Sequence, residues 1–242
     1  PEETVGGAET MIRDSGLENP HLDFVTGLHV MPYLPVGLME TRKGALNGSS
    51  TMLDFTVRGK SCHAATPEDG LDAVVMAAQL VTALQAVVAR YVSPMENAVL
   101  TIGSIHGGTA RNIIVDEVRM EGTLRTTSDA VRDVLLERIR GLTEGLPASF
   151  GGSGELSITY GYKALINDPE LVDLVAETAI DVLGPESVTW KQHPSMGVED
   201  FAYFAAARPG VFYHLGCGNT RKGISSPLHT PTFDIEDRKS VV

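Results

Sequence analysis

The order of secondary-structure elements in the middle of the chain constrains its fold most strongly. Apolar periodicity there predicts the succession strand, helix, strand, strand, helix, strand. The predicted strands cover residues 51–58, 98–105, 117–125 and 155–160, and the predicted helices cover 71–91 and 129–146. This is the order of a ferredoxin-like split unit. Glycine-rich stretches lie near both ends, at 44–48 and 151–154, so a small α+β domain is predicted over residues 48–160.

The segments on either side of this block share a different pattern. Residues 7–14 predict a short helix, and the apolar run 22–30 predicts a buried strand that ends at His29. Further elements are predicted as helices at 168–183 and 199–207 and as a strand at 210–216. Residues 1–47 and 161–242 are therefore predicted to form one larger α/β domain, split around the inserted domain.

Composition excludes several classes of partner. Hydrophobic residues make up 43% of the 242 residues, which is enough for a core, and the net charge of -12 argues against binding nucleic acid or anionic membranes. No run of about 18 apolar residues is found, so no transmembrane helix is predicted. The two cysteines, Cys62 and Cys217, suit a reducing compartment, and we expect a cytoplasmic protein. A chain that begins at Pro1 leaves a signal peptide undecided.

Glu2 and Glu3 form an adjacent carboxylate pair that runs into a Gly-Gly turn. In a metal hydrolase, one such carboxylate can hold a metal ion while the other activates water. In the alternative, purely structural interpretation, the two acids would only stabilise the start of a helix through its dipole.

Three histidines stand where chemistry is expected. His29 closes a predicted apolar strand, His229 lies between two prolines, and His63 follows Cys62 in a loop. Imidazole and carboxylate groups together are ligands that zinc and similar divalent ions prefer. Each histidine taken alone is as readily a satisfied core or loop residue, and no local spacing is a metal signature by itself.

Five strings decide between these interpretations when they are taken together. They are PEETVGGAETMI, GLHVMPYLPVG, GSIHGGTARNIIVDEVRMEGTLRT, MGVEDFAYF and PLHTPTFDI, in this order along the chain. In combination they resemble the M20 family of metallopeptidases. Within that family they are similar to the amidohydrolase branch, which includes hippurate hydrolases, N-acyl-amino-acid deacylases and auxin-conjugate hydrolases. The fold implied is a split α/β metallohydrolase catalytic domain with an inserted ferredoxin-like lid and dimerisation domain.

The resemblance assigns roles around a two-metal centre. It implies that Glu2 is the general base and that Glu3, His29 and His229 are metal ligands. Two divalent ions are expected, and zinc, manganese, cobalt or nickel would fit these ligands. An upstream element of the form His or Cys, any residue, His or Asp completes the site in this branch and is not in this sequence. We therefore expect weak or single-metal occupancy of the chain itself.

The resemblance also implies contacts to the substrate. His63 matches a histidine that the lid presents to the neighbouring subunit, where it would stabilise an oxyanion. Asn112 matches a polar substrate contact, although Asn is also common in turns. Arg125 could clamp a substrate carboxylate or could simply be a solvated strand end. Glu199 and Asp200 could orient a ligand imidazole, or could be an acid pair at a helix start.

These assignments predict a metal-dependent amidohydrolase that cleaves N-acyl amino acids or similar small conjugates and works as a homodimer through its lid. Two alternatives stay open. The chain could be a catalytically incomplete fragment or degenerate homologue that binds or dimerises, or the enzyme could be a dipeptidase or aminoacyl peptidase.

Overall fold

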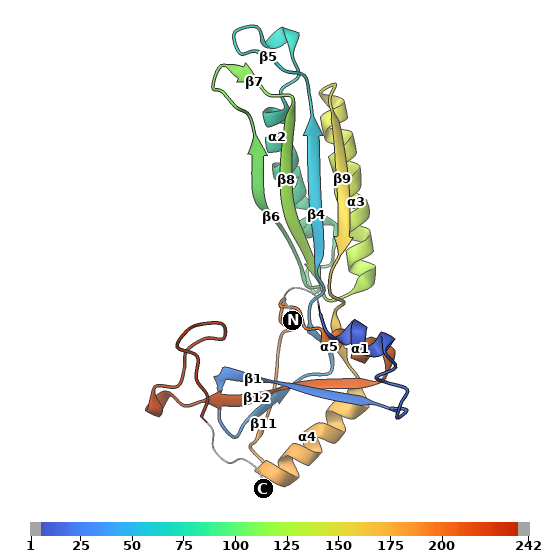
Figure 1. Cartoon of the computed structure of the whole chain (residues 1–242), viewed down its shortest axis with the longest axis vertical. Helices are drawn as coiled ribbons and strands as arrows, with labels where there is room; N and C mark the ends of the chain where they lie inside the picture. Colours follow the sequence, from blue (N-terminus) through green and yellow to red (C-terminus); the bar gives the residue numbers. More distant parts are fainter. Residues whose placement is uncertain (1–5, 237–242) are drawn as a thin grey trace. The chain divides into compact units, whose positions relative to one another are not determined.

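The computed structural model describes residues 6–236 and divides into two compact units (Figure 1). Unit 1 consists of Pro1–Asn47 together with Lys163–Val242, and unit 2 consists of Gly48–Tyr162. Unit 2 therefore interrupts unit 1 in the sequence. Both units mix helices with sheets, so the chain has the predicted α/β character.

Unit 1 is built on a four-stranded sheet with the strand order β1-β12-β2-β11. These strands are β1 Val25–Pro35, β2 Met39–Thr41, β11 Val188–Trp190 and β12 Gly210–Gly218. A second sheet pairs β3 Gly44–Asn47 with β10 Leu165–Asn167, and the helices are α1 Ala8–Arg13, α4 Pro169–Leu183 and α5 Phe201–Ala207. β1 and β12 run parallel in register, so their side chains face the same way at each paired position.

The first strand extends further than its sequence suggests. We predicted that it ends at His29, which is wrong, because β1 continues to Pro35 and includes Pro32. Among residues 6–236, β1 lies at the edge of its sheet next to β12, and its register with β12 shifts between Met31 and Pro35. An edge strand tolerates proline, because a missing N–H costs nothing where no neighbour needs it.

Helix α4 begins where the sequence predicts. Asp168 is its N-cap, and the carboxylate accepts hydrogen bonds from the backbone N–H groups of Glu170 and Leu171 at 2.9 and 3.1 Å. Pro169 occupies the first helical position, where its lack of an N–H is harmless.

The residue before this cap, Asn167, joins three parts of unit 1. Its side chain is fully buried (0% exposed). The amide nitrogen Nδ2 donates to the carbonyls of Phe212 and Arg42 at 2.9 and 3.0 Å, and Oδ1 accepts the N–H of Phe212 at 2.8 Å. Three backbone groups in the interior thus depend on one amide.

We expect Asn167→Ala to lower the free energy of unfolding by about 2–3 kcal/mol, because buried backbone groups lose their partners. Urea unfolding followed by circular dichroism measures this change. Gln192→Ala is the control, since Gln192 is exposed and its side chain donates to the carbonyl of Trp190 at the surface. Equal midpoints for the two variants would contradict the role given to Asn167.

Unit 2 has the predicted order of elements. Its sheet order is β6-β8-β4-β9, and every neighbouring pair is antiparallel. The elements are β4 Thr51–Arg58, α2 Ala73–Tyr91, β6 Ala98–Gly107, β8 Glu117–Thr126, α3 Asp129–Ser149 and β9 Ser153–Tyr160. A two-stranded sheet of β5 Cys62–His63 and β7 Ile113–Ile114 is separate from these strands. Asp72 caps α2 and Ser128 caps α3, as predicted for Ser128.

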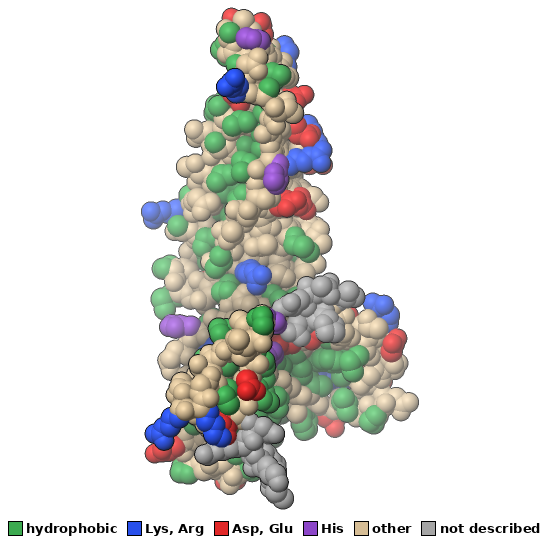
Figure 2. All heavy atoms as spheres, turned by 60° about the vertical axis from the view of Figure 1, so that its left-hand side comes forward, with side chains coloured by type: hydrophobic (Ala, Val, Ile, Leu, Met, Phe, Trp, Pro, Cys, Tyr) green, Lys and Arg blue, Asp and Glu red, His purple; other side chains and the backbone are tan. Residues whose placement is uncertain are grey.

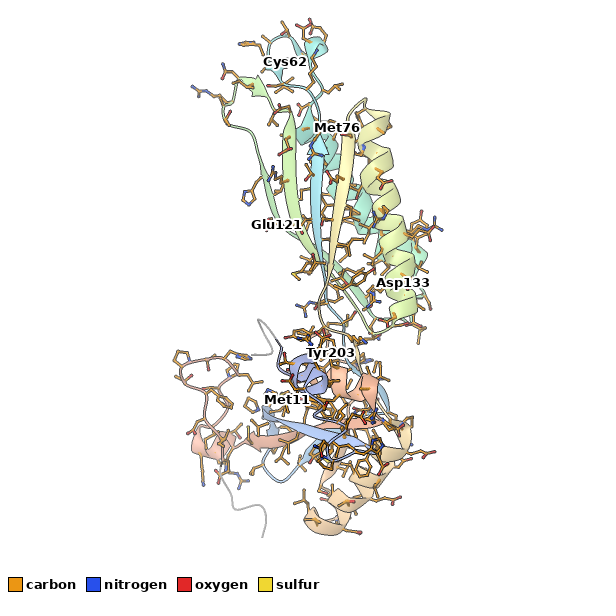
Figure 3. All side chains as sticks on the ribbon, turned by 45° about the vertical axis from the view of Figure 1, so that its right-hand side comes forward. Met11, Cys62, Met76, Glu121, Asp133 and Tyr203 are labelled. Carbon is orange, nitrogen blue, oxygen red and sulfur yellow. The ribbon has the colours of Figure 1, made fainter. Side chains whose placement is uncertain are left out.

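The core of unit 2 lies between its sheet and its two long helices. Burial alternates along β4, which places Leu53, Phe55 and Val57 inside, where they pack in one cluster with residues of α2 such as Leu80. Met76 of α2 belongs to the same cluster (Figure 3). The alternation of buried and exposed residues is what a strand with one covered face requires.

Helix α2 is the segment of the described residues that bears on the predicted absence of a transmembrane helix. By length and composition alone it is apolar enough to cross a membrane, although Gln79, Thr82 and Gln85 interrupt its apolar residues. Met76, Leu80 and Leu84 of this helix are buried in the core of unit 2. A single helix of this length and composition is weak evidence for a membrane span, because the core helix of a globular domain has the same properties.

Candidate metal centre and substrate contacts

His29 is held in one tautomer by its own strand. Its Nδ1 lies 2.8 Å from the backbone carbonyl oxygen of Val30. A carbonyl only accepts, so Nδ1 carries the hydrogen and Nε2 of the neutral ring keeps its lone pair. Metal-binding histidines characteristically tie their second ring nitrogen to a carbonyl or carboxylate in this way. The geometry of His29 therefore suits a metal ligand.

A second histidine, His214, lies next to His29 in the sheet. His214 of β12 is the register partner of His29 and is only 3% exposed. Its Nδ1 lies 3.1 Å from both Oε2 of Glu40 and the hydroxyl of Tyr33. The same Glu40 oxygen accepts hydrogen bonds from Tyr33 at 2.6 Å and from Lys191 at 3.1 Å. Four polar side chains thus form one network around a single carboxylate oxygen.

Burial and hydrogen bonding set the charges in this network. Burial raises the pKa of Glu40, but hydrogen bonds from Tyr33, His214 and Lys191 outweigh it and hold that pKa below its ordinary value. Burial lowers the pKa of His214, against the opposing effect of Glu40. Burial and the bond to Glu40 raise the pKa of Tyr33. Near neutral pH the network therefore contains an ionised Glu40 and a neutral His214.

His229 has a constrained backbone. Its φ is +61°, in the left-handed region that residues other than glycine seldom occupy. Such a conformation costs roughly 1–3 kcal/mol and persists only where neighbouring structure imposes it. Two hydrogen bonds shape this segment: the Thr230 hydroxyl donates to the carbonyl of Pro227 at 2.8 Å, and the N–H of Glu236 donates to Cys217 at the end of β12. The loop that carries His229 thus leaves β12 at its carboxyl end and returns to it.

The predicted base and first ligand, Glu2 and Glu3, lie outside the described residues. The segment that follows them is fixed by Asp200, whose Oδ2 accepts the N–H groups of Gly7 and Ala8 at 2.8 and 3.2 Å. Glu199 accepts the N–H of Phe201 at 3.4 Å. Within the described residues, Asp200 therefore contacts the start of α1 rather than an imidazole.

No group of three or more His, Cys, Asp or Glu side chains able to hold a metal ion occurs among residues 6–236. The predicted set of Glu3, His29 and His229 includes one residue outside that range, so the set stays a prediction. The donors that the structure does describe fit a divalent transition metal, because His29 offers an imidazole nitrogen with its lone pair available.

Unit 2 brings His63 and Asn112 together. His63 is in β5, and Asn112 immediately precedes β7, the strand that pairs with β5. The N–H of Ala64 donates to the carbonyl of Asn112 at 3.0 Å. Nδ1 of His63 accepts the N–H of Ala65 at 3.1 Å, so the neutral ring carries its hydrogen on Nε2. His63 is exposed and presents a donor, which is the opposite of the tautomer of His29. A hydrogen-bond donor such as this Nε2–H group is what contact with an oxyanion requires.

Arg125 is not close to these two residues within unit 2. It pairs with Val99 near the carboxyl end of β8, whereas β5 and β7 lie beyond the other end of β8 (Figure 1). Arg125 is half-buried. The structure therefore separates the three predicted substrate contacts into two places.

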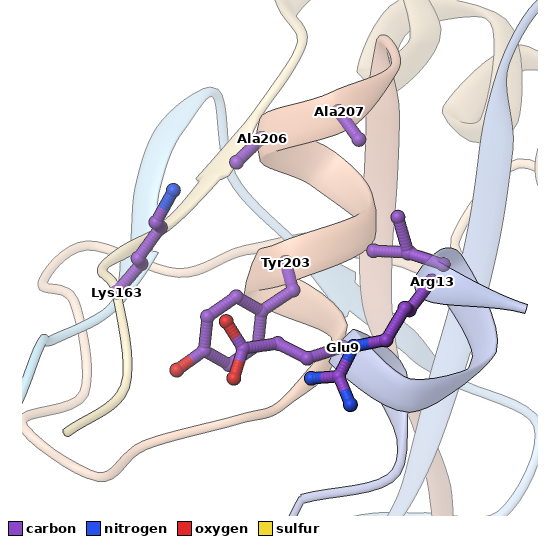
Figure 4. Close-up of a pocket in the computed structure, with 7 residues that line it drawn as sticks. Glu9, Arg13, Lys163, Tyr203, Ala206 and Ala207 are labelled. Carbon is purple, nitrogen blue, oxygen red and sulfur yellow. The ribbon is translucent and has the colours of Figure 1, made fainter.

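A hollow of about 350 Å³ lies between α1 and α5 of unit 1 (Figure 4). Glu9, Arg13, Lys163 and Tyr203 supply its polar lining. None of the predicted site residues lines this hollow, and its side chains include both charge signs.

Reasoning from the sequence missed the residues around Glu40. The residues that the sequence predicts for the site include none of His214, Tyr33, Glu40 and Lys191. One signal was present: a histidine occurs in each of two apolar strands, at His29 and at His214. Only the pairing of the strands makes these two positions neighbours.

Comparison with known proteins identifies the family. The sequence model of peptidase family M20/M25/M40 matches residues 1–242 of this chain. The uncharacterized hydrolase y4tI of Sinorhizobium fredii is 38% identical over 96% of the chain and 56% of its own length. N-acetyldiaminopimelate deacetylase of Bacillus licheniformis is 38% identical over 89% of the chain and 57% of its own length.

A solved structure agrees with these relatives. The Bacillus subtilis YXEP protein, described as a dinuclear metal binding peptidase from the M20 family, matches with a TM-score of 0.80 and 27% identity over 97% of this chain and 57% of that one. The chain thus spans less than three fifths of the length of these relatives. With its whole length matched by one family, the chain belongs to peptidase family M20/M25/M40.

Proposed function

We propose that the full-length protein is a metal-dependent amidohydrolase that cleaves the amide bond of N-acyl amino acids or similar small conjugates. The observation that carries this proposal is the family match over all 242 residues, together with a deacetylase relative at 38% identity. The two free thiols, Cys62 and Cys217, support the cytoplasm as its location.

The proposed chemistry divides among named residues. Glu3, His29 and His229 hold divalent ions, which when bound polarise the scissile carbonyl and make water more acidic. Glu2 accepts the proton of the attacking water and passes it to the leaving amine. The Nε2–H group of His63 donates to the oxyanion, and this role is supported by the hydrogen bond that Ala65 makes to Nδ1.

Other residues orient the substrate and the base. Asn112 donates to the substrate, and Arg125 pairs with its carboxylate. Asp200 fixes the segment that follows Glu2 and Glu3, because it accepts the N–H groups of Gly7 and Ala8. Glu199 accepts the N–H of Phe201 at the start of α5. This role for Asp200 replaces the contact to an imidazole that we expected.

A substrate panel tests the proposal. The full-length protein is assayed on acylated amino acids and on dipeptides, with zinc, manganese, cobalt and nickel in turn. Release of the acyl group at a higher kcat/KM than dipeptide cleavage is expected. Faster cleavage of dipeptides would favour a peptidase, and no hydrolysis with any of the metals would favour a binding module.

We also propose that two copies pair through the lid, which is unit 2. β6 lies at the edge of its sheet, is ten residues long and contains no Asp, Glu, Lys or Arg. Val99 and Ile105 of this strand are exposed, and Figure 2 shows apolar side chains on the surface of unit 2. An uncharged edge strand of this length is a ready site for pairing with a second copy.

His63→Ala is expected to lower kcat roughly 10²–10³-fold while the dimer mass stays the same, because one oxyanion donor is lost. His21→Ala is the matched control, since His21 is an exposed histidine whose ring contacts Glu18 and Asp23. Light scattering checks the dimer. Full turnover of the variant would rule out the oxyanion role.

Mixing two inactive variants tests whether His63 acts in the neighbouring subunit. Equal amounts of His63→Ala and Glu2→Gln protein, allowed to exchange subunits, should regain about a quarter of wild-type activity, because half of the resulting symmetric dimers hold one intact site. No recovery, with exchange verified by differently tagged subunits, would place His63 in its own subunit's site.

A further inference from the structure

His214 and His29 form a pair of imidazoles on one face of the main sheet of unit 1. They are register partners on neighbouring parallel strands, so both side chains leave the sheet on the same side. His29 is half-buried and His214 is almost entirely buried. Nothing in the proposed function uses His214.

The hydrogen bonds determine which nitrogen of each imidazole ring carries no hydrogen. Tyr33 has a single hydroxyl hydrogen and gives it to Glu40 at 2.6 Å. Nδ1 of His214, which faces both of these oxygens at 3.1 Å, must therefore be the donor in its own bonds. In His29, Nδ1 likewise donates to Val30. Both neutral rings consequently present Nε2 with a lone pair.

The Nε2 atoms of both rings take no part in these hydrogen bonds. Within residues 6–236, the side-chain hydrogen bonds of both histidines are made by Nδ1. A ring nitrogen that keeps its lone pair can accept a hydrogen bond or bind a metal ion.

The hydrogen bonds around His214 orient its ring as they would for a metal ligand. Tyr33 and Lys191 both donate hydrogen bonds to Oε2 of Glu40 and hold it in place against Nδ1 of His214. A fixed carboxylate on Nδ1 orients the ring and makes Nε2 a stronger metal ligand. A packing role alone would need neither the carboxylate nor a polar ring.

We propose that His214 is an additional ligand for a divalent transition-metal ion beside His29, with Glu40 as the carboxylate that orients it. This inference rests on the metal site of the proposed function. Imidazole nitrogen suits zinc, cobalt and nickel, and a carboxylate–histidine–metal arrangement is a recurring one.

Zinc titration of the 242-residue chain with ¹⁵N-labelled histidine tests the inference, with His29 and His214 assigned through His29→Ala and His214→Phe. Before zinc is added, the spectra should show both rings with hydrogen on Nδ1. Zinc should then shift the Nε2 resonances of His29 and His214 together. Glu40→Gln should weaken zinc binding about 10–100-fold, the usual cost of losing a group that orients a ligand, and His214→Phe should weaken it at least as much. His21→Phe, at an exposed histidine away from this network, should change nothing.

The outcomes separate this inference from the proposed function. A shift of His29 alone, with zinc affinity unchanged in His214→Phe, would overturn the role of His214 and leave the metal site standing. No shift of either ring would overturn both. Should His214→Phe fail to fold, His214→Gln supplies the assignment and the wild-type spectra decide, because the Nε2 of His214 either moves with zinc or does not.

Discussion

Glu2→Gln is expected to lower the turnover of the full-length protein by about 10²–10⁴-fold, the usual contribution of a positioned general base. Glutamine keeps the size of the side chain but cannot accept a proton at neutral pH. Since Glu3 rather than Glu2 is the proposed ligand, the zinc content should stay unchanged. Steady-state kinetics and metal analysis of the same preparation measure the two quantities.

A matched control for this change lies in the helix that follows. Glu9→Gln removes an exposed carboxylate of α1 and should leave kcat unaltered. Loss of zinc in Glu2→Gln would exchange the roles of the two acids, and full activity without zinc loss would exclude Glu2 as the base.

Phe55→Ala is expected to lower the free energy of unfolding of unit 2 by about 3–5 kcal/mol, the usual cost of removing a large ring from a packed core. Phe55 is 1% exposed and belongs to the cluster formed by β4, α2 and α3. Urea unfolding followed by circular dichroism measures the loss.

The same strand supplies the control for Phe55. Met52 of β4 is 47% exposed, so Met52→Ala should change stability by no more than about 0.5 kcal/mol. A similar loss in both variants would mean that the alternation along β4 does not separate a packed face from an open one.

Local signals in the sequence were enough to place much of unit 2. The alternation in residues 51–58 predicts β4, and Ser128 marks the start of α3 because its side chain can accept a backbone N–H of the first turn. The order of six elements then restricts the topology to few choices. The same reasoning found Asp168 and Pro169 at the start of α4.

Other parts of the fold depend on neighbours that are distant in the sequence. Strands β2, β10 and β11 have three residues each, too few for a periodic pattern. β1 continues through Pro32 where its pairing with β12 shifts register between Met31 and Pro35, an irregularity that the sequence does not reveal.

The candidate site divides in the same way. Motifs pointed to His29, His63 and Asn112, but the tautomers of the two histidines follow from backbone contacts that no motif encodes. The bond between Glu40 and His214 joins residues 174 positions apart, so only the folded sheet brings them together.

The strands β3 and β10 reveal how the insertion was accommodated. They pair antiparallel, with Asn47 opposite Leu165, and unit 2 occupies the sequence between them. In effect they are a β-hairpin whose turn has been exchanged for a whole domain. Because both ends of that domain leave from adjacent strands, the insert can be lengthened, replaced or lost in evolution while the hydrogen bonding of the host sheet is kept.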